Sequence, residues 1–382
     1  MKLVTACLSS SAQWDGSSFS ALDSPQTLLL LFGASDLIDQ PDTIRNVLAA
    51  CPQSQVIGCS TSGEIHGTHI IDNHLVAAAV RFEHSQLRTA RATVSGPAES
   101  YAAGSAVAAQ LQGPSLKAVF VLSDGLSVNG SELVKGMNDV LKGSAVITGG
   151  LAGDGARFKR TWVIMDRTPQ SGYVTAVGFY GDRLTVGHGS KGGWDKFGPE
   201  RRVTKSAGNV LYELDGRPAL ELYKEYLAER AAGLPATALL FPLALRAAKD
   251  DEKSLVRTVL GVDEATHSLT FAGDIPQGAL AQLMRANFDR LVAGASEAAS
   301  LTHRSQTSPY ASGPTLAVAI SCVGRRLVLG ERTEEETEAA LDMLPQGSQQ
   351  IGFYSYGEIS PYSGGPCDLH NQTMTLTTLA EA

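Results

Sequence analysis

One pattern occurs three times along this chain and restricts the folds open to it. Each copy is an apolar run ending in turn residues, a helical stretch, a second apolar run and a glycine-rich loop that closes on an acid. The copies cover residues 27–65, 118–155 and 315–360. Such a repeat indicates internal duplication. Because strands alternate with helices, we expect an α/β protein of two layered domains, with mixed β-sheets flanked by helices.

The closing loops are most alike in the first and third copies. IGCSTSGEI (57–65) matches IGFYSYGEI (351–359) at its Ile-Gly and Gly-Glu-Ile positions, whereas residues 147–154 keep only the Ile, a Gly and an acid. Glycine permits backbone conformations closed to other residues. Two interpretations of these loops stay open. Either their acids accept backbone N–H bonds or contact a ligand, or the loops do no more than turn the chain. These acids are Glu64, Asp154 and Glu358.

The loops lack the motifs of common catalytic sites. Cys59 is not a repeated nucleophile, because Phe353 fills the matching position in the third copy and Gly149 in the second. GCSTSG differs from the G-x-S-x-G nucleophile elbow, and GGLAGDG lacks the Lys-Ser/Thr of a phosphate-binding loop. We therefore expect no enzyme. A hydrolase that uses Cys59 or a loop acid is the third hypothesis we keep open.

Composition and charge exclude several classes. The chain has 382 residues, is 43% hydrophobic and carries a net charge of −8, which favours a globular protein and disfavours nucleic-acid binding. No apolar run reaches the ~18 residues that span a bilayer. Only six residues precede Cys7, too few for a signal segment. Its 5 cysteines form no C-x-x-C pair, so we expect neither disulfides nor structural zinc in a cytoplasmic protein.

Several segments together resemble the FIST domain pair. They are IGCSTSGEI, GGLAGDG, ELDGRPALELY (213–223), and IGFYSYGEISP with the following LHNQTMTLT. The resemblance covers residues 28–376 and implies a bacterial sensory module for a small ligand. We expect an N-terminal sensory domain over 25–217 and a C-terminal domain over 218–365. A helix is predicted near 218–230, with Leu220, Tyr223 and Leu227 on its packed face.

Residues 184–202, LTVGHGSKGGWDKFGPERR, indicate one branch within the FIST proteins. They are similar to the NosP branch of FIST proteins, which are haem-binding nitric-oxide sensors that regulate histidine kinases. This resemblance implies that His188 is the axial iron ligand of a non-covalent haem b. It also implies nitric oxide and a sensor histidine kinase as partners, leaves a homo-oligomer open, and implies neither nucleic acid nor membrane.

The residue types around His188 suit that chemistry. Haem iron takes an imidazole donor, which must be neutral, as the ordinary histidine pKa allows. The flanking Gly187 and Gly189 remove side-chain bulk that would keep a flat macrocycle from the backbone. Other side chains of the segment would wall the ring or pair with its propionates: Trp194, Phe197, Arg201 and Arg202. We expect His188 to lie in a flexible, glycine-rich loop. Displacement of His188 by nitric oxide would move this loop, which leads to the helix near Pro218.

The remaining histidines and apolar segments have plainer interpretations. His66, His69 and His74 form no tetrahedral ligand set with a carboxylate or cysteine, and His370 is interpreted as a structural hydrogen-bonding residue. Residues 236–248 are predicted to include a strand at a sheet edge or bulge, because Pro242 interrupts the run. Residues 275–299 are predicted to form a helix with an apolar face: Leu280, Leu283, Met284, Phe288 and Leu291.

A second sensory hypothesis does without haem. The chain would then be a FIST sensor of another small molecule, such as an amino acid, whose ammonium group the loop acids Glu64, Asp154 and Glu358 contact. Stabilisation by amino acids without haem uptake would favour it.

Overall fold

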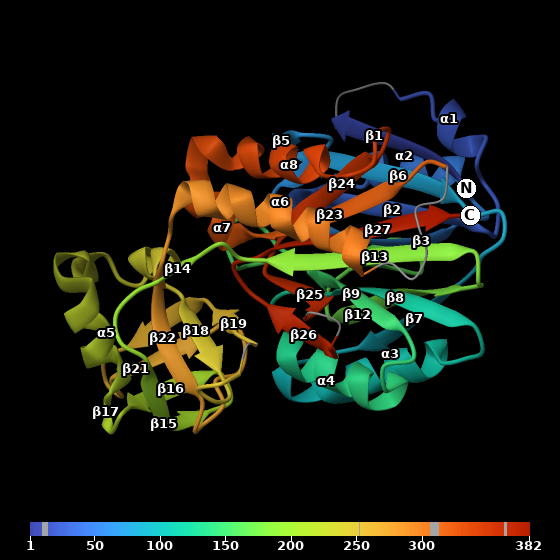
Figure 1. Cartoon of the computed structure of the whole chain (residues 1–382). Helices are drawn as coiled ribbons and strands as arrows, with labels where there is room; N and C mark the ends of the chain where they lie inside the picture. Colours follow the sequence, from blue (N-terminus) through green and yellow to red (C-terminus); the bar gives the residue numbers. More distant parts are fainter. Residues whose placement is uncertain (10–13, 252, 306–312, 363–364) are drawn as a thin grey trace.

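The computed structural model describes residues 1–382 except 10–13, 252, 306–312 and 363–364. Within these residues, three six-stranded sheets with helices on their outer faces adjoin a nine-stranded sheet that forms a separate lobe (Figure 1). We call the three six-stranded sheets and their helices the body, and residues 192–287, which hold the nine-stranded sheet, the insert. The predicted α/β class, with mixed sheets flanked by helices, is confirmed.

The first sheet of the body shows the arrangement that the others repeat. Only its β2–β3 pair is parallel, and the helix between these two strands covers the outer face. In sheet order the strands are β1 (Lys2–Ser9), β6 (His74–Arg81), β2 (Thr27–Ala34), β3 (Gln55–Thr61), β10 (Val163–Met165) and β11 (Thr168–Gln170). The helices are α1 (Ser17–Ser20), the 3-10 turn η1 (Ser35–Ile38) and α2 (Asp42–Ala50). Ile44, Val47 and Leu48 of α2 are buried.

The second and third sheets have the same order and the same single parallel pair. The second contains β7 (Gln86–Thr93), β12 (Tyr173–Tyr180), β8 (Leu116–Ser123), β9 (Val146–Leu151), β25 (Gly357–Pro361) and β26 (Cys367–His370). The third contains β13 (Leu184–Lys191), β27 (Met374–Glu381), β23 (Leu316–Cys322), β24 (Gln349–Ser355), β4 (Glu64–His66) and β5 (His69–Ile71). Their helical segments are η2 (Pro97–Glu99), α3 (Ser100–Leu111), α4 (Gly130–Leu141), α6 (Phe288–Arg304), α7 (Val323–Leu329), η5 (Gly330–Arg332) and α8 (Thr333–Asp342).

The three units exchange hairpins in cyclic order. The β4–β5 hairpin of the first unit pairs with β24 in the third sheet, and the β10–β11 hairpin of the second unit pairs with β3 in the first. The β25–β26 hairpin of the third unit pairs with β9 in the second sheet. The predicted threefold repeat is therefore present in the fold, as three interlocked units around a pseudo-threefold axis.

The central strands of the body are buried on both faces. Leu28, Leu30 and Phe32 of β2 point into a central core to which all three sheets contribute. Leu29 and Leu31 point to the opposite face and pack under α2. Alternate side chains of a strand point to opposite faces, so strands covered on both sides have near-continuous apolar sequences.

The insert lies between β13 and α6 in the sequence of the third unit. Its strands are β14 (Asp195–Lys196), β15 (Arg201–Ala207), β16 (Val210–Leu214), β17 (Arg217–Pro218), β18 (Leu243–Arg246), β19 (Leu255–Arg257), β20 (Val259–Asp263), β21 (Ser268–Phe271) and β22 (Leu280–Arg285). Its helical segments are α5 (Ala219–Leu227), η3 (Ala228–Gly233) and η4 (Ala236–Leu240). On α5, Leu220, Tyr223 and Leu227 are buried, as predicted. The domain boundary expected from sequence, between Arg217 and Pro218, falls inside β17. The body is built from segments on both sides of the insert.

Two predictions about this region were wrong. Residues 275–299 do not form one helix: β22 occupies the first part, and α6 begins at Phe288 after Asn287, whose side chain accepts the N–H of Arg290. Pairing of β22 with β18 outweighed the helical spacing of the apolar residues. Strand β18 is also no edge strand, because it pairs with β19 and β22. Pro242 precedes its first residue, where a missing N–H costs no ladder bond.

Candidate ligand-binding site

The three glycine-rich loops meet at the pseudo-threefold axis. Each loop donates one backbone N–H to a carbonyl of the next loop, which closes a cyclic set of three hydrogen bonds. The donors and acceptors are Ser62 N to Tyr354 O (2.8 Å), Tyr356 N to Leu151 O (3.2 Å) and Gly153 N to Ser60 O (3.0 Å). The loops therefore join the three units directly.

The strand register shows which loop residues are equivalent. A Cβ on Gly58, Gly149 or Gly352 would lie only 2.3, 1.8 or 1.8 Å from a carbonyl oxygen of the parallel neighbour strand. These three glycines thus occupy one equivalent position. The second loop is consequently shifted by one residue against the alignment expected from sequence, and Gly150, not Gly149, matches Cys59.

Glu64 and Glu358 are equivalent and fully internal. Glu64 accepts the Thr61 hydroxyl and the N–H of His74 (3.2 Å). Glu358 accepts the Ser355 hydroxyl (2.6 Å) and both the N–H and the hydroxyl of Thr373. Burial raises the pKa of each carboxyl to about 8. Each carboxyl ties its loop to the last strand of its own unit, so the two groups brace the fold instead of facing a ligand.

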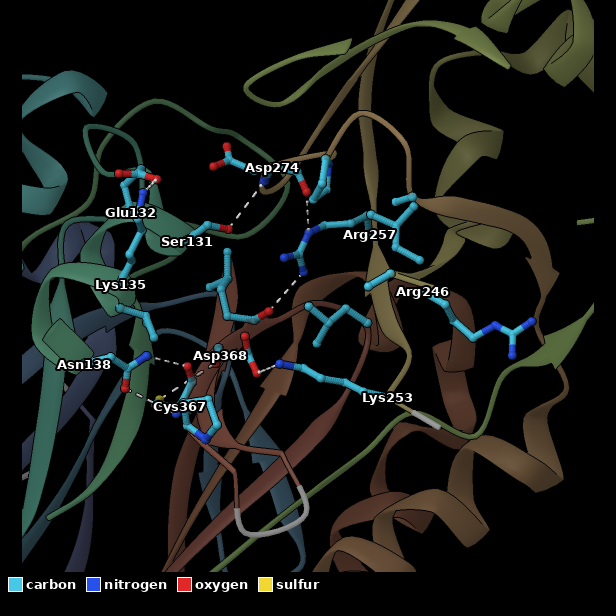
Figure 2. Close-up of a pocket in the computed structure, with 18 of the residues that line it drawn as sticks. Ser131, Glu132, Lys135, Asn138, Arg246, Lys253, Arg257, Asp274, Cys367 and Asp368 are labelled. Atoms are coloured by element: carbon cyan, nitrogen blue, oxygen red, sulfur yellow. Dashed lines mark hydrogen bonds and ion pairs between the residues drawn. The ribbon is translucent and has the colours of Figure 1, made fainter. Parts of the chain in front are cut away.

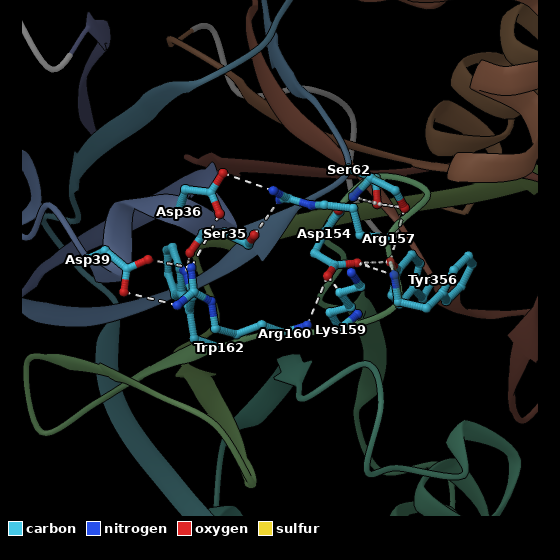
Figure 3. A network of polar contacts seen from close by, with 12 residues as sticks. Ser35, Asp36, Asp39, Ser62, Asp154, Arg157, Lys159, Arg160, Trp162 and Tyr356 are labelled. Atoms are coloured by element: carbon cyan, nitrogen blue, oxygen red, sulfur yellow. Dashed lines mark hydrogen bonds and ion pairs between the residues drawn. The ribbon is translucent and has the colours of Figure 1, made fainter.

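Asp154 has a different role, because the one-residue shift places it where Gly63 lies in the first loop. Its carboxylate accepts the N–H groups of Phe158, Lys159 and Arg160, all at 2.8 Å, and the Tyr356 hydroxyl (Figure 3). Burial would raise its pKa, but these hydrogen bonds outweigh burial and hold the pKa below its usual value.

The loop that Asp154 organises is also tied to the first unit. Arg157 pairs with Asp36 (2.8 Å), and Arg160 contacts both Asp36 and Asp39 (Figure 3). These ion pairs lie at the surface, so they orient the loop more than they stabilise it.

Cys59 is unsuited to nucleophilic chemistry. Its side chain is fully buried in the central core. Burial raises the pKa of its thiol well above the ordinary value, and a protonated thiol is a poor nucleophile.

His188 lies within β13, not in a flexible loop. Its backbone N–H donates to the Ser305 hydroxyl, which in turn donates to the His188 carbonyl, both at 2.8 Å. The side chain is 8% exposed, and burial lowers the pKa of the ring. The ring makes no hydrogen bond with any residue that the structure describes. His188 is therefore a neutral, partner-free imidazole, which is the state an iron ligand requires.

The glycines beside His188 have a packing role. A Cβ on Gly187 would lie 2.4 Å from the Thr302 carbonyl, and one on Gly189 would lie 2.0 Å from the Ala298 carbonyl. Both carbonyls belong to α6, so the bare backbone of β13 receives this helix on its outer face. The space that we expected a macrocycle to use is filled by α6.

The other residues expected at a haem are not gathered around His188. Trp194 is buried and donates its indole N–H to the Gln372 carbonyl (2.8 Å). Phe197 packs on the core of the insert. Arg201 bonds Tyr226 and Asp215, and Arg202 donates to the Gly278 carbonyl. His188 could thus bind an iron, but the other expected residues assemble no pocket around it for the macrocycle or its propionates.

Other expected features are resolved more simply. His66 contacts Thr5 and His69 pairs with Glu334, while His370 is buried and bonds the Ser360 carbonyl, which confirms its structural role. No group of three potential metal ligands occurs among the residues with described positions. Over the same residues, no helix has the length and apolar character needed to cross a membrane.

Sequence reasoning missed a cavity of about 560 Å³ between the body and the insert (Figure 2). Its walls come from α4 and β26 on one side and from β18 and β19 on the other. The buried Arg257 extends into this space. A lone arginine in a short strand carries no recognisable motif, so only the packing of body against insert reveals it.

Comparisons with known proteins fit this architecture. Residues 27–217 match the FIST N domain and residues 219–361 match the FIST C domain, so the chain belongs to the FIST family. FIST domains are sensory modules of signal transduction. Two proteins of Mycobacterium tuberculosis, from strains CDC 1551 / Oshkosh and ATCC 25618 / H37Rv, are 25% identical over 372 residues. The match covers 93% of this chain and 91% of each relative, and both relatives are described as uncharacterized.

A crystal structure of a cyanuric acid hydrolase from A. caulinodans aligns over 99% of this chain and 98% of that chain. The identity is 10% and the TM-score is 0.36. No statement about activity follows from a likeness at this level.

Proposed function

We propose that this FIST protein is a haem-based nitric-oxide sensor that binds non-covalent haem b through His188 and regulates a partner histidine kinase. The observation that carries the proposal is the buried imidazole of His188, which is neutral and makes no hydrogen bond with the described residues. With no hydrogen bond to a described residue, a ring nitrogen of His188 is available to bind an iron ion. The NosP-like sequence of residues 184–202 adds the expectation that the iron belongs to haem.

The arrangement of β13 limits how haem is accommodated. The His188 side chain points to the face of β13 opposite α6, the face that Leu184 and Val186 share, and it is buried. Haem uptake at His188 therefore requires a rearrangement of this part of the body. When bound, haem supplies the iron that binds nitric oxide. The protein's own contribution is the link from His188 through the Ser305 hydroxyl to the end of α6. A displaced His188 would therefore shift α6, whose other end adjoins the insert.

The test is a haem titration followed by absorption spectroscopy of the ferrous protein with and without nitric oxide. We expect the parent to take up one haem and to shift its Soret band, and His188→Ala to lose haem. His74→Ala is the matched control, because His74 lies outside the core and its ring bonds only locally to Asp72 O. If the parent binds no haem, or His188→Ala keeps an unchanged spectrum, His188 is not the ligand.

Regulation of a kinase has a separate test. The autophosphorylation rate of a candidate histidine kinase is measured with haem-loaded protein, before and after nitric oxide. We expect a change that His188→Ala abolishes. Equal rates under all conditions would remove that kinase as the partner.

A haem-free small-ligand sensor is the second candidate, and the cavity between body and insert favours it. The ammonium contact first expected for this sensor is disfavoured, because Glu64, Asp154 and Glu358 are bonded within the fold. Thermal unfolding with a panel of amino acids, in the absence of haem, tests this candidate. A shift of melting temperature without haem uptake would support it.

A further inference from the structure

The cavity between the body and the insert has a charged lining. Residues of α4 and β26 face residues of β18 and β19 across it (Figure 2). The ionisable side chains on its walls are Glu132, Lys135, Asp139, Arg246, Asp251, Lys253, Arg257, Asp274 and Asp368. Ligand sites commonly lie at such junctions between two parts of a protein.

Three of the four cations on these walls already have carboxylate partners. Lys135 pairs with Glu132 (3.2 Å) and Lys253 with Asp368 (2.5 Å). Arg246 pairs with Glu200, which lies outside the cavity. The remaining cation is Arg257, which forms no ion pair with the residues of described position.

Arg257 is 4% exposed and is held by backbone carbonyls alone. Its Nε donates to Asp274 O (3.2 Å), and its Nη1 donates to Val256 O and Leu369 O. Nη2 makes no hydrogen bond within the described structure. Figure 2 shows the guanidinium extending from β19 toward the α4 side of the cavity.

The other deeply buried arginine of the described chain shows what is missing. Arg325 is 0% exposed and bonds both Nε and Nη2 to Glu336. A buried charge normally requires such a partner, because desolvation without one is costly. Arg257 has the burial of Arg325 without the carboxylate.

The backbone is shaped around this guanidinium. Gly273 has a φ of +139°, and a Cβ there would lie 2.9 Å from Arg257 Nε. Burial lowers the pKa of Arg257 to about 10, so the group stays charged at neutral pH. A positive charge thus faces the cavity, where Asp368 and Asp274 attract it without forming an ion pair with it among the described contacts.

We infer that this cavity binds a small organic carboxylate, with Arg257 Nη2 as its anchor. The Ser131 hydroxyl lies on the facing wall, where it accepts the N–H of Asp274 (3.4 Å) and donates its proton to no residue of described position. A guanidinium matches the geometry of a carboxylate. The inference does not depend on haem at His188, and gives the haem-free sensor of the preceding section a site and a ligand class.

A ligand held there contacts both the body and the insert. Its binding would favour one arrangement of the two over others, which is the requirement for a sensor with two states. This consequence rests on the proposed sensory function, whereas the binding itself does not.

The test uses the full, haem-free chain and three probes: succinate, glutarate and benzoate. Melting temperature and isothermal titration calorimetry are measured against sodium chloride at equal ionic strength and against succinamide, the neutral isostere of succinate. We expect at least one carboxylate to raise the melting temperature and succinamide to have no effect. If no carboxylate exceeds sodium chloride, the inference is wrong.

Two variants locate the binding, and one serves as control. Ala247→Trp adds bulk at the exposed rim of the cavity and leaves Arg257 itself unchanged, and Arg257→Gln removes the anchor. We expect each to weaken carboxylate binding at least tenfold. Arg246→Gln removes an already paired cation of the same wall and should leave binding within about threefold of the parent. If Arg257→Gln does not fold, Ala247→Trp decides alone; unchanged binding by it overturns the inference.

Discussion

The first and third loops of the body differ from the second in how they use an acid. Glu64 and Glu358 brace a loop against the last strand of its unit, and burial raises their pKa values to about 8. Asp154 instead holds three backbone N–H groups of its own loop, and its pKa is lowered. The physical reason is the length of the connection that follows the loop. The next strands, β4 and β25, begin within the first and third loops, whereas after the second loop β10 begins only at Val163. Similar topology therefore does not imply similar chemistry at equivalent loops.

The largest expected effect tests the one-residue shift of the second loop. Gly149→Ala places a Cβ 1.8 Å from the Val121 carbonyl at a φ of +147°, so it should cost about 4 kcal/mol of unfolding free energy. Gly150→Ala should cost less, because its nearest contact is a side-chain methyl of Ile320 at 3.0 Å. Urea unfolding measures both.

Gly143→Ala is the control for backbone conformation alone. Gly143 has a φ of +76°, and a Cβ added there would meet no described atom within 4 Å, so we expect a cost of about 1 kcal/mol. If Gly149→Ala costs no more than Gly150→Ala, the one-residue shift is wrong.

An intermediate effect is expected for the aspartate of the second loop. Asp154→Ala leaves three N–H groups and the Tyr356 hydroxyl without their acceptor, which should cost about 3 kcal/mol. Asp182→Ala is the control, since Asp182 forms an exposed pair with Lys117, which solvent screening keeps weak. Equal costs in urea unfolding would mean that Asp154 does not organise its loop.

The effect that is smallest over a single step, here one pH unit, concerns the slope of stability against pH. Folding raises the pKa of Glu358 to about 8, from about 4.3 in the unfolded chain. Between these values only the folded state keeps the proton, so stability falls as pH rises, by about 1.4 kcal/mol per pH unit. Glu358→Gln and Glu64→Gln should each remove their share of this slope.

The measurement is the free energy of unfolding at several pH values between about pH 5 and pH 8, the window that the raised pKa values set. Glu132→Gln is the matched control, because Glu132 is only partly buried and pairs with Lys135. A Gln variant with the parental slope would show that the buried glutamate is ionised in the folded protein, like Asp154.

Part of this structure was predictable from local sequence. The strand–helix–strand repeats, helix α2 and the packed face of α5 follow from apolar periodicity, which reflects burial along a single element. The helix expected over 275–299 failed because β22 gains its stability from pairing with β18, a contact between segments far apart in sequence. The resemblance at residues 184–202 pointed to His188, but it placed the residue in a loop and not in β13.

By itself the sequence determined the threefold repeat, the α/β class and the family, because apolar periodicity and short loop motifs are local signals. Only the tertiary structure decided the cyclic exchange of hairpins, the offset of the second loop and the packing of α6 onto Gly187 and Gly189. It also decided that Arg257 is buried beside a cavity, with no carboxylate partner among the described residues. Such features depend on which distant segments meet in the fold. Strand pairing and desolvation act between residues that are far apart in the sequence, so local sequence patterns do not show them.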